Sequence, residues 1–159
     1  MSLISDLEGF ASLVSGNQKE YFMDILSIAK PVEVVSILEV FTDEEIRMIK
    51  RVVRPKKKMC YMNSHKLTDL FPDKVRYVEG RFSFIGIPID HAFNRVGDKY
   101  IDITVELALK EDVSEHEYIA YAEYDSDEIY EAAIETGYYG DYYKNYWLKE
   151  KKSNKILQT

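Results

Sequence analysis

Three residues of this sequence carry the groups that acyl-transfer chemistry by a thiolate requires. Cys60 is the only cysteine, and His91 and Asp102 follow it along the chain. A thiolate can act as nucleophile, an imidazole as the base that takes its proton, and a carboxylate as the group that orients the imidazole. These residue types indicate a reaction class, acyl transfer or hydrolysis, and they leave the substrate open.

The position of Cys60 favours a reactive thiol. Residues 60–71 read as a helix that Pro72 ends, so Cys60 lies at the helix N-terminus. A helix N-terminus presents unpaired amide donors and a partial positive charge, which stabilise a thiolate and an oxyanion. Lysines at positions 56–58 add positive charge just before the cysteine. Asn63, one helical turn after Cys60, could support the substrate or the oxyanion, although an exposed polar helix residue is an equally good interpretation.

His91 and Asp102 are predicted to lie on two strands of one hairpin. The dipeptide at 97–98, Gly-Asp, is a two-residue turn signal between strands over 91–96 and 99–105. If the residues that flank the turn face each other, His91 and Asp102 are diagonal neighbours on one face, with Cα atoms roughly 7–8 Å apart. A register that differed by one residue would place them on opposite faces. The predicted register therefore allows the carboxylate to hold one nitrogen of the imidazole.

This stretch resembles the transglutaminase-like branch of the papain-like thiol hydrolases. In that branch a cysteine heads a helix, a histidine on a strand precedes Ala-Trp or a similar pair, a turn contains Gly, and an aspartate precedes a small residue and Thr. The corresponding residues here are His91-Ala92-Phe93-Asn94, Gly97-Asp98 and Tyr100-Ile101-Asp102-Ile103-Thr104. Phe93 stands where the family often has Trp, and Ile103 stands where it often has Pro.

The resemblance covers residues 59–105 and implies Cys60 as nucleophile, His91 as base and Asp102 as the group that orients the base. It implies a protein or peptide substrate and leaves peptidase, amidase, deamidase and transglutaminase activities open. Many small proteins of this type are encoded by phages, so the resemblance also suggests a phage protein.

The remaining sequence predicts an α+β fold in a single domain. Helices come first, a nucleophile helix then packs on a small antiparallel sheet, and helices follow at the C-terminus. The expected parts are a helical N-terminal part over 1–53, a transglutaminase-like core over 59–124 and a helical tail over 125–159. Within them we expect a helix from Pro31, a helix opened by the capping box at Thr42, strands over 76–87 and 118–124 with a bend at Gly80, a helix over 125–136, and a final helix from Tyr138 that frays from Ser153.

Composition narrows the functional classes. The net charge of -7 argues against a general nucleic-acid binder, because phosphate attraction needs a basic surface. One cysteine cannot form an internal disulfide or a zinc site of several thiolates, and no metal or cofactor is expected. The beginning of the chain lacks a basic segment followed by a long apolar run, and no stretch is apolar enough to span a membrane, so the expected location is the cytoplasm.

Other chemically active side chains rank lower. His65 is expected at the surface, because it points away from Cys60 on a regular helix. Asp90 is expected on the opposite face from His91, and Asp98 lies in the predicted turn, so both compete poorly with Asp102. His116 lies between two glutamates, but adjacent residues on a strand face apart, which disfavours a metal site.

Two segments of the sequence could bind a partner. The basic run over 51–58 is read as a solvated linker, with recognition of an anionic substrate tail or acidic partner as the alternative. Tyrosines and Trp147 crowd the C-terminal segment and could form a partner interface, although packing onto the core is the preferred interpretation. The second functional hypothesis is therefore a non-catalytic binding module or inhibitor on a degenerate hydrolase scaffold, acting through this aromatic, acidic surface.

Overall fold

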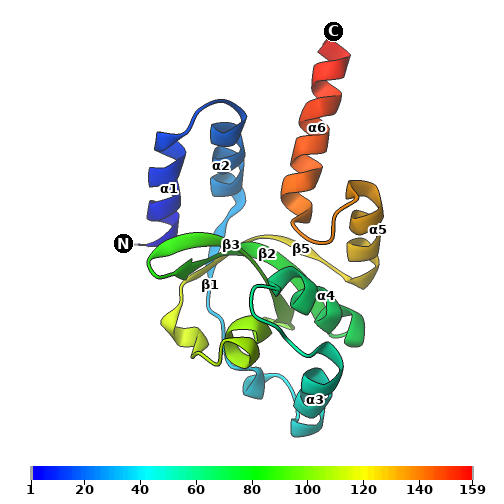
Figure 1. Cartoon of the computed structure of the whole chain (residues 1–159). Helices are drawn as coiled ribbons and strands as arrows, with labels where there is room; N and C mark the ends of the chain where they lie inside the picture. Colours follow the sequence, from blue (N-terminus) through cyan, green and yellow to red (C-terminus); the bar gives the residue numbers. More distant parts are fainter. Residues whose placement is uncertain (1, 159) are drawn as a thin grey trace.

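The computed structural model describes residues 2–158, with side chains described through residue 154, and it confirms the α+β class (Figure 1). The helices are α1 (Leu3–Leu13), α2 (Gly16–Ile28), α3 (Asp43–Met48), α4 (Cys60–Leu70), α5 (Ser126–Thr136) and α6 (Tyr142–Gln158). The strands are β1 (Lys30–Val32), β2 (Val75–Phe84), β3 (Ile87–Val96), β4 (Lys99–Ile101) and β5 (Tyr118–Tyr124). Four short helical segments are η1 (Ile37–Glu39), η2 (Ile49–Val53), η3 (Thr104–Ala108) and η4 (Val113–Glu115).

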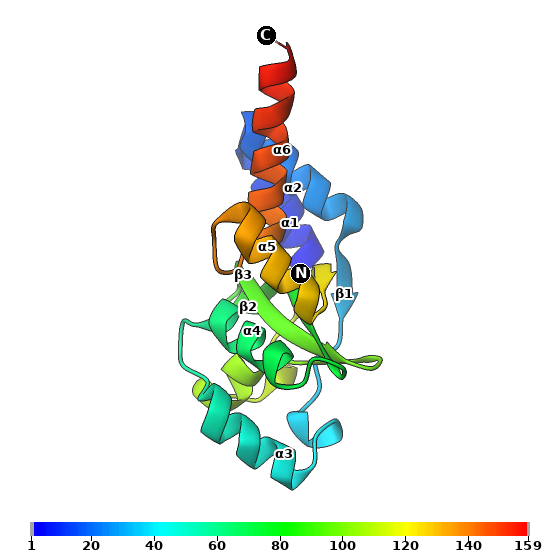
Figure 2. The ribbon, with the colours of Figure 1, turned by 90° about the vertical axis from the view of Figure 1, so that its right-hand side faces the viewer.

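The five strands form one antiparallel sheet in the order β1-β5-β2-β3-β4. Figure 1 shows α1, α2 and α6 on one side of the molecule and α3 on the opposite side. Figure 2 shows α4 and α5 side by side on the sheet, where α4 packs against β2 and β3 and α5 packs against β2 and β5. The nucleophile helix predicted from the sequence therefore does pack on the sheet.

Alternate residues of the central strands serve two different cores. Val78 and Phe93 point into a core that includes residues of η3 and β5. Tyr77 and Ala92 point to the other face and pack against α5 and α6. Successive side chains of a strand face opposite ways, so β2 contributes to both cores. Because each face of β2 is covered by one of these cores, nearly all of its residues are buried.

The prediction of helices throughout residues 1–53 is wrong for the segment between Ile28 and α3, where only η1 is helical. Residues 30–32 form an edge strand on β5, with Pro31 opposite Ile119, and Pro31 does not begin a helix. Proline restricts the residue before it to extended conformations, and an edge strand tolerates its missing N–H. Lys30 pairs with Ala120, which is 90 residues later in the sequence, and this pairing with β5 overrides the local helical pattern.

Local signals at several helix ends are confirmed. Thr42 accepts a hydrogen bond from the Glu45 amide while Glu45 caps the Thr42 amide, which completes the predicted capping box of α3. The helix predicted over 125–136 begins with a second capping box at Asp125 and ends at Gly137 in the left-handed conformation.

The final helix differs from the prediction at both ends. It begins at Tyr142 and not at Tyr138, because the chain turns at residues 138–141, and it continues past the expected fraying point at Ser153 to Gln158.

The predicted strand over 76–87 is interrupted by a turn that the sequence analysis missed. Ile85 and Gly86 both have positive φ, 51° and 73°, and reverse the chain between β2 and β3. Two positive φ values match a type I′ turn, in which Asn or Asp usually precedes Gly. Ile at the first position hides that signal, since β-branched residues rarely adopt this conformation.

The predicted bend at Gly80 is present as a register shift between Glu79 and Gly80 in the pairing with β5. A Cβ atom at Gly80 would lie 1.9 Å from the carbonyl oxygen of Ile119, so the close approach of the strands requires glycine. Beside this bulge the buried Glu79 carboxylate accepts hydrogen bonds from the amides of Tyr142 and Tyr143 at 2.7 and 2.8 Å. The central strand thus caps the N-terminus of α6.

Candidate active site

The structure brings His91 and Asp102 together as the hairpin register predicted. Arg95 pairs with Tyr100 across the turn, and the ladder ends at Ile101. Asp102 therefore lies one residue beyond β4, on the face of the sheet that carries His91. The Nε2 atom of His91 is 2.6 Å from Oδ2 of Asp102.

Hydrogen bonds from three directions fix the Asp102 carboxylate. Tyr118 donates its hydroxyl to Oδ2 at 2.7 Å, while the amides of Thr104 and Val105 donate to Oδ1 at 3.1 and 3.2 Å. The carboxylate is fully buried. A buried charge with this many donors is both compensated and held in one orientation, as an orienting group must be.

Aromatic rings enclose His91. Phe82 stacks on the imidazole with a centroid separation of 4.0 Å, and Phe93 lies parallel on the same face of the strand, 6.1 Å away. Because Nε2 is used by Asp102, the Nδ1 atom is the one that remains for another partner. Stacking and the carboxylate together restrict the ring to one orientation.

The electrostatics of the pair favour an imidazolium beside a carboxylate. Burial alone would lower the pKa of His91, but the adjacent Asp102 charge and hydrogen bond, with a smaller contribution from Cys60, raise it above its ordinary value. Burial alone would raise the pKa of Asp102, but His91 and the Tyr118 hydroxyl lower it. At neutral pH the pair is therefore ionised, with His91 cationic.

Cys60 is the first residue of α4, as predicted, and its side chain is half-buried. The thiol lies close enough to His91 to affect the pKa of the imidazole, although residues 2–158 show no well-aligned hydrogen bond between them. Contacts of this kind are often loose without substrate and tighten when it binds. Among the described residues, no acceptor pairs with the backbone amides of Cys60, Tyr61 and Met62, so the first turn of α4 keeps its donors available.

Asn63 has a position that neither sequence interpretation anticipated. It is buried rather than exposed, and its amide group is fully engaged. Nδ2 donates to the Lys56 carbonyl at 2.8 Å and to the Thr104 hydroxyl at 2.9 Å, and Oδ1 accepts from the Lys56 amide at 3.1 Å. Asn63 therefore ties the loop before Cys60 to the segment after Asp102 and is a positioning residue.

The prediction that His65 lies at the surface is wrong. His65 is buried, its ring centroid lies 4.4 Å from that of Tyr139 in a tilted arrangement, and its Nδ1 atom is 2.8 Å from the Tyr139 hydroxyl. Burial lowers the pKa of His65, which favours the neutral ring. The segment after α5 covers this face of α4, and no local pattern in the α4 sequence reveals that contact.

The other candidates are placed outside the triad. Asp90 is on the opposite face from His91, where it forms an ion pair with Arg81 at 2.9 Å, and Asp98 is exposed in the turn. His116 pairs with Glu111 at 2.8 Å. Within the part of the chain that the structure describes, no group of three or more potential ligands could hold a metal ion.

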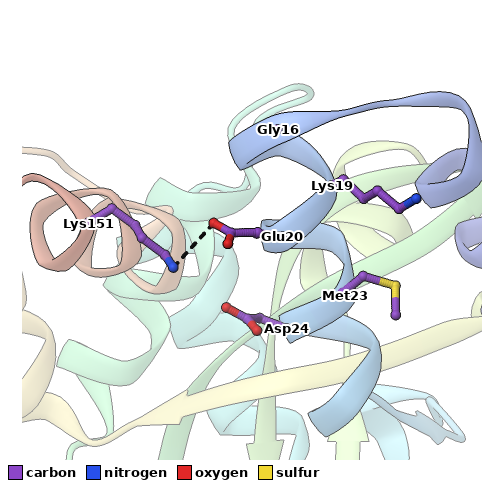
Figure 3. Close-up of a pocket in the computed structure, with 6 residues that line it drawn as sticks. All are labelled: Gly16, Lys19, Glu20, Met23, Asp24 and Lys151. Atoms are coloured by element: carbon purple, nitrogen blue, oxygen red, sulfur yellow. Dashed lines mark ion pairs between the residues drawn. The ribbon is translucent and has the colours of Figure 1, made fainter. Parts of the chain in front are cut away.

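The aromatic residues of α6 pack mainly inward. Trp147 and Tyr142 are buried, and the Trp147 indole donates to Asp24 on α2. A cavity of about 340 Å³ lies between α2 and α6, and in it Lys151 pairs with Glu20 at 3.3 Å. Figure 3 shows the residues that line this cavity and the ion pair. None of the residues that line this cavity belongs to the triad. No helix among residues 2–158 has the length and apolar character needed to cross a membrane.

Sequence reasoning missed Tyr118 and Phe82, two neighbours of the His91–Asp102 pair. Both lie on strands that were predicted, but only the pairing of β5 with β2 places their rings beside His91 and Asp102. Comparison with known protein families, curated proteins and solved structures gives no match.

Proposed function

We propose that this protein catalyses acyl transfer or hydrolysis at an amide, isopeptide or thioester bond, with Cys60 as nucleophile. The observation that carries the proposal is the meeting of a half-buried thiol, at an open helix N-terminus, with a buried and oriented His91–Asp102 pair. Each group alone has an ordinary structural explanation, but their combination supplies nucleophile, proton carrier and oxyanion donors in one place.

The reaction would begin with the cationic His91 beside Cys60, which stabilises the thiolate form electrostatically. The sulfur attacks the carbonyl carbon, a C–S bond forms, and the carbonyl electron pair moves onto oxygen. Amides in the first turn of α4 stabilise this oxyanion. As the intermediate collapses, Nδ1 of His91 gives its proton to the leaving group, and an acyl thioester remains on Cys60.

The second half of the reaction uses the same groups in reverse. His91, now neutral, takes a proton from water or from an acceptor amine as that nucleophile attacks the thioester carbonyl. The C–S bond breaks and Cys60 is released as a thiolate beside the imidazolium. Asp102 acts throughout by orienting His91 and stabilising its positive charge, while Tyr118 and Asn63 act as positioning residues.

The test is the rate at which iodoacetamide alkylates Cys60 between about pH 4 and pH 10, in the native protein and in His91→Ala. We expect rapid alkylation that persists below pH 7 in the native protein and is lost in the variant. His116→Ala is the matched control, because it also removes a partly buried histidine paired with a carboxylate. Slow alkylation below pH 7 in the native protein, or equal rates in native protein and His91→Ala, would remove the basis for a catalytic Cys60.

A binding module on the same scaffold is the second candidate, because an exposed apolar and aromatic patch lies on α5 and the segment after it. Ile134 and Tyr138 are 83% and 61% exposed. Removal of everything after Gly137 would not test this idea cleanly, since α6 contributes buried residues to two cores. The double variant Ile134→Ser, Tyr138→Ser should abolish partner capture and leave alkylation of Cys60 unchanged if binding is the function.

A further inference from the structure

A basic cavity lies beside the loop that leads to Cys60. It has a volume of about 670 Å³, and its walls come from η2, the loop after η2, and η3 with the residues that follow. Four cationic side chains line it: Lys50, Arg54, Lys56 and Lys110. We call this cavity the basic groove.

The charge of the basic groove is opposite to that of the whole chain. The chain carries a net charge of -7, yet four cations gather here around one carboxylate, Glu106. That carboxylate is already engaged, because it accepts hydrogen bonds from the Ser36 hydroxyl at 2.6 Å and the Ile37 amide at 2.9 Å. Within the described part of the chain, none of the four cations has a carboxylate oxygen within 4.0 Å. The groove therefore has a net positive charge, and none of its four cations forms an ion pair among the described residues.

The backbone that carries these cations is held in defined positions. Arg54 and Lys110 have φ values of 51° and 57°, a left-handed conformation that is uncommon for residues other than glycine. The Arg54 amide donates to the Ile49 carbonyl at 3.2 Å, and Asn63 binds both backbone groups of Lys56. Hydrogen bonds thus hold the backbone at Arg54 and Lys56, two of the four cationic positions.

Hydrogen bonds of Asn63 also connect the basic groove to the candidate active site. Asn63 joins Lys56, at the edge of the groove, to Thr104, two residues after Asp102. Cys60 follows Lys56 by four residues at the start of α4. A chain bound in the groove would therefore lie along the loop that positions the nucleophile.

We propose that the basic groove binds an acidic peptide segment of a partner protein. Four cations can pair with several Asp or Glu side chains at once, while Pro55 and Leu107 offer apolar contact to the peptide backbone and its methylene groups. A long polyanion such as nucleic acid is disfavoured, because its phosphates would extend beyond the groove onto an acidic protein. The inference goes beyond the proposed function, because binding here does not require a reactive Cys60.

The experiment is fluorescence anisotropy with a fluorescein-labelled peptide of alternating Glu and Gly residues, titrated with the full chain at low salt. The test variant is the double change Lys50→Glu, Lys110→Glu, which reverses one cation on each wall. The control is Lys19→Glu, Lys66→Glu, which alters net charge equally at exposed lysines away from the groove. Both double variants are checked for native secondary structure by circular dichroism, and Lys50→Gln, Lys110→Gln replaces the test variant if it does not fold.

We expect the test variant to lose at least about tenfold in peptide affinity and the control to lose less than about threefold, with weaker binding for all proteins at higher salt. Equal losses in both double variants would overturn the proposal, since they would show only a response to net charge. Tighter binding of a labelled oligothymidylate than of the peptide, or displacement of the peptide by inorganic phosphate at equal charge, would overturn it in favour of a nucleic-acid or small-anion site. Repetition in Cys60→Ala separates the two proposals, because peptide binding should persist there whether or not Cys60 is catalytic.

Discussion

The buried carboxylate of Glu79 should give this protein an unusual dependence of stability on pH. Glu79 lies on the central strand and caps α6 through the amides of Tyr142 and Tyr143, with a further hydrogen bond from the Tyr77 hydroxyl at 2.6 Å. Full burial raises the pKa of Glu79 to about 7, because the loss of hydration outweighs the hydrogen bonds that favour the charged form.

The sign of the effect follows from proton binding. The unfolded chain has the ordinary glutamate pKa, 4.5, so between about pH 4.5 and pH 7 the folded state binds a proton that the unfolded state lacks. The cost of burying the charge is fully present above pH 7 and is relieved as the pH falls through that window. The difference of about 2.5 pH units corresponds to about 3 kcal/mol, of which about 2 to 3 kcal/mol should appear between pH 8 and pH 5.

The assay is urea unfolding of the native protein and Glu79→Gln at about pH 5 and about pH 8. Glutamine keeps one acceptor oxygen for the α6 amides and loses the other, which lowers the free energy of unfolding by roughly the same amount at both pH values. Other titrating groups, including His91 and Asp102, are present in both proteins and cancel in the difference. On acidification the native protein should therefore gain about 2 to 3 kcal/mol relative to Glu79→Gln.

The matched control is Glu44→Gln, which removes the same charge from an exposed position in the first turn of α3. Its stability difference from the native protein should be almost the same at both pH values. If the native protein instead lost stability relative to Glu79→Gln on acidification, the helix amides would be holding Glu79 in its charged form. Burial would then not be the dominant influence on the pKa of Glu79.

Three further changes test other parts of the structure. Asp102→Asn should keep the acceptor for the backbone amides but present an amide donor to His91 Nε2, which places the imidazole proton on the wrong nitrogen. Turnover should then fall by about 10⁴-fold, and iodoacetamide alkylation of Cys60 near pH 6 should lose its dependence on the histidine. Gly80→Ala should cost about 3 kcal/mol or more in urea unfolding, because the new Cβ would lie 1.9 Å from a backbone oxygen, and soluble protein of unchanged stability would show that the strands can separate there. Ile85→Asn should raise the unfolding free energy by about 1 kcal/mol, since Ile85 is 85% exposed at a φ of 51° that asparagine tolerates; a loss would indicate that the Ile85 side chain has a binding or packing role.

The sequence was most informative where a structural signal is local. The capping patterns at Thr42 and Asp125 set the starts of α3 and α5, because a cap depends only on residues three positions apart. The Gly97-Asp98 turn fixed the register of β3 with β4, and with it the shared face of His91 and Asp102. Cys60 was placed at a helix start from the run of residues before Pro72, although α4 has no side-chain cap.

Prediction failed where contacts between distant segments compete with local preference. Pro31 reads as a helix start, but its segment becomes a strand because β5 offers a free edge. His65 reads as a surface residue of a helix, but the segment after α5 covers it. Asn63 reads either as an exposed residue or as support for a substrate, but the Lys56 loop and Thr104 bury it. Helical periodicity gives the angle of a residue around its own helix and cannot say what packs against that angle.

The sequence by itself determined the α+β class and the shared hairpin face of His91 and Asp102, and it suggested the reaction class that we propose. Only the tertiary structure decided that Tyr118 and Phe82 complete the surroundings of His91 and Asp102, and that Lys110 joins the basic run in one groove. The physical reason is range: caps, turns and strand alternation arise from bonded geometry and neighbours a few residues apart. The surroundings of a site depend on which distant surfaces bury one another, and that is settled by the summed packing of the whole chain.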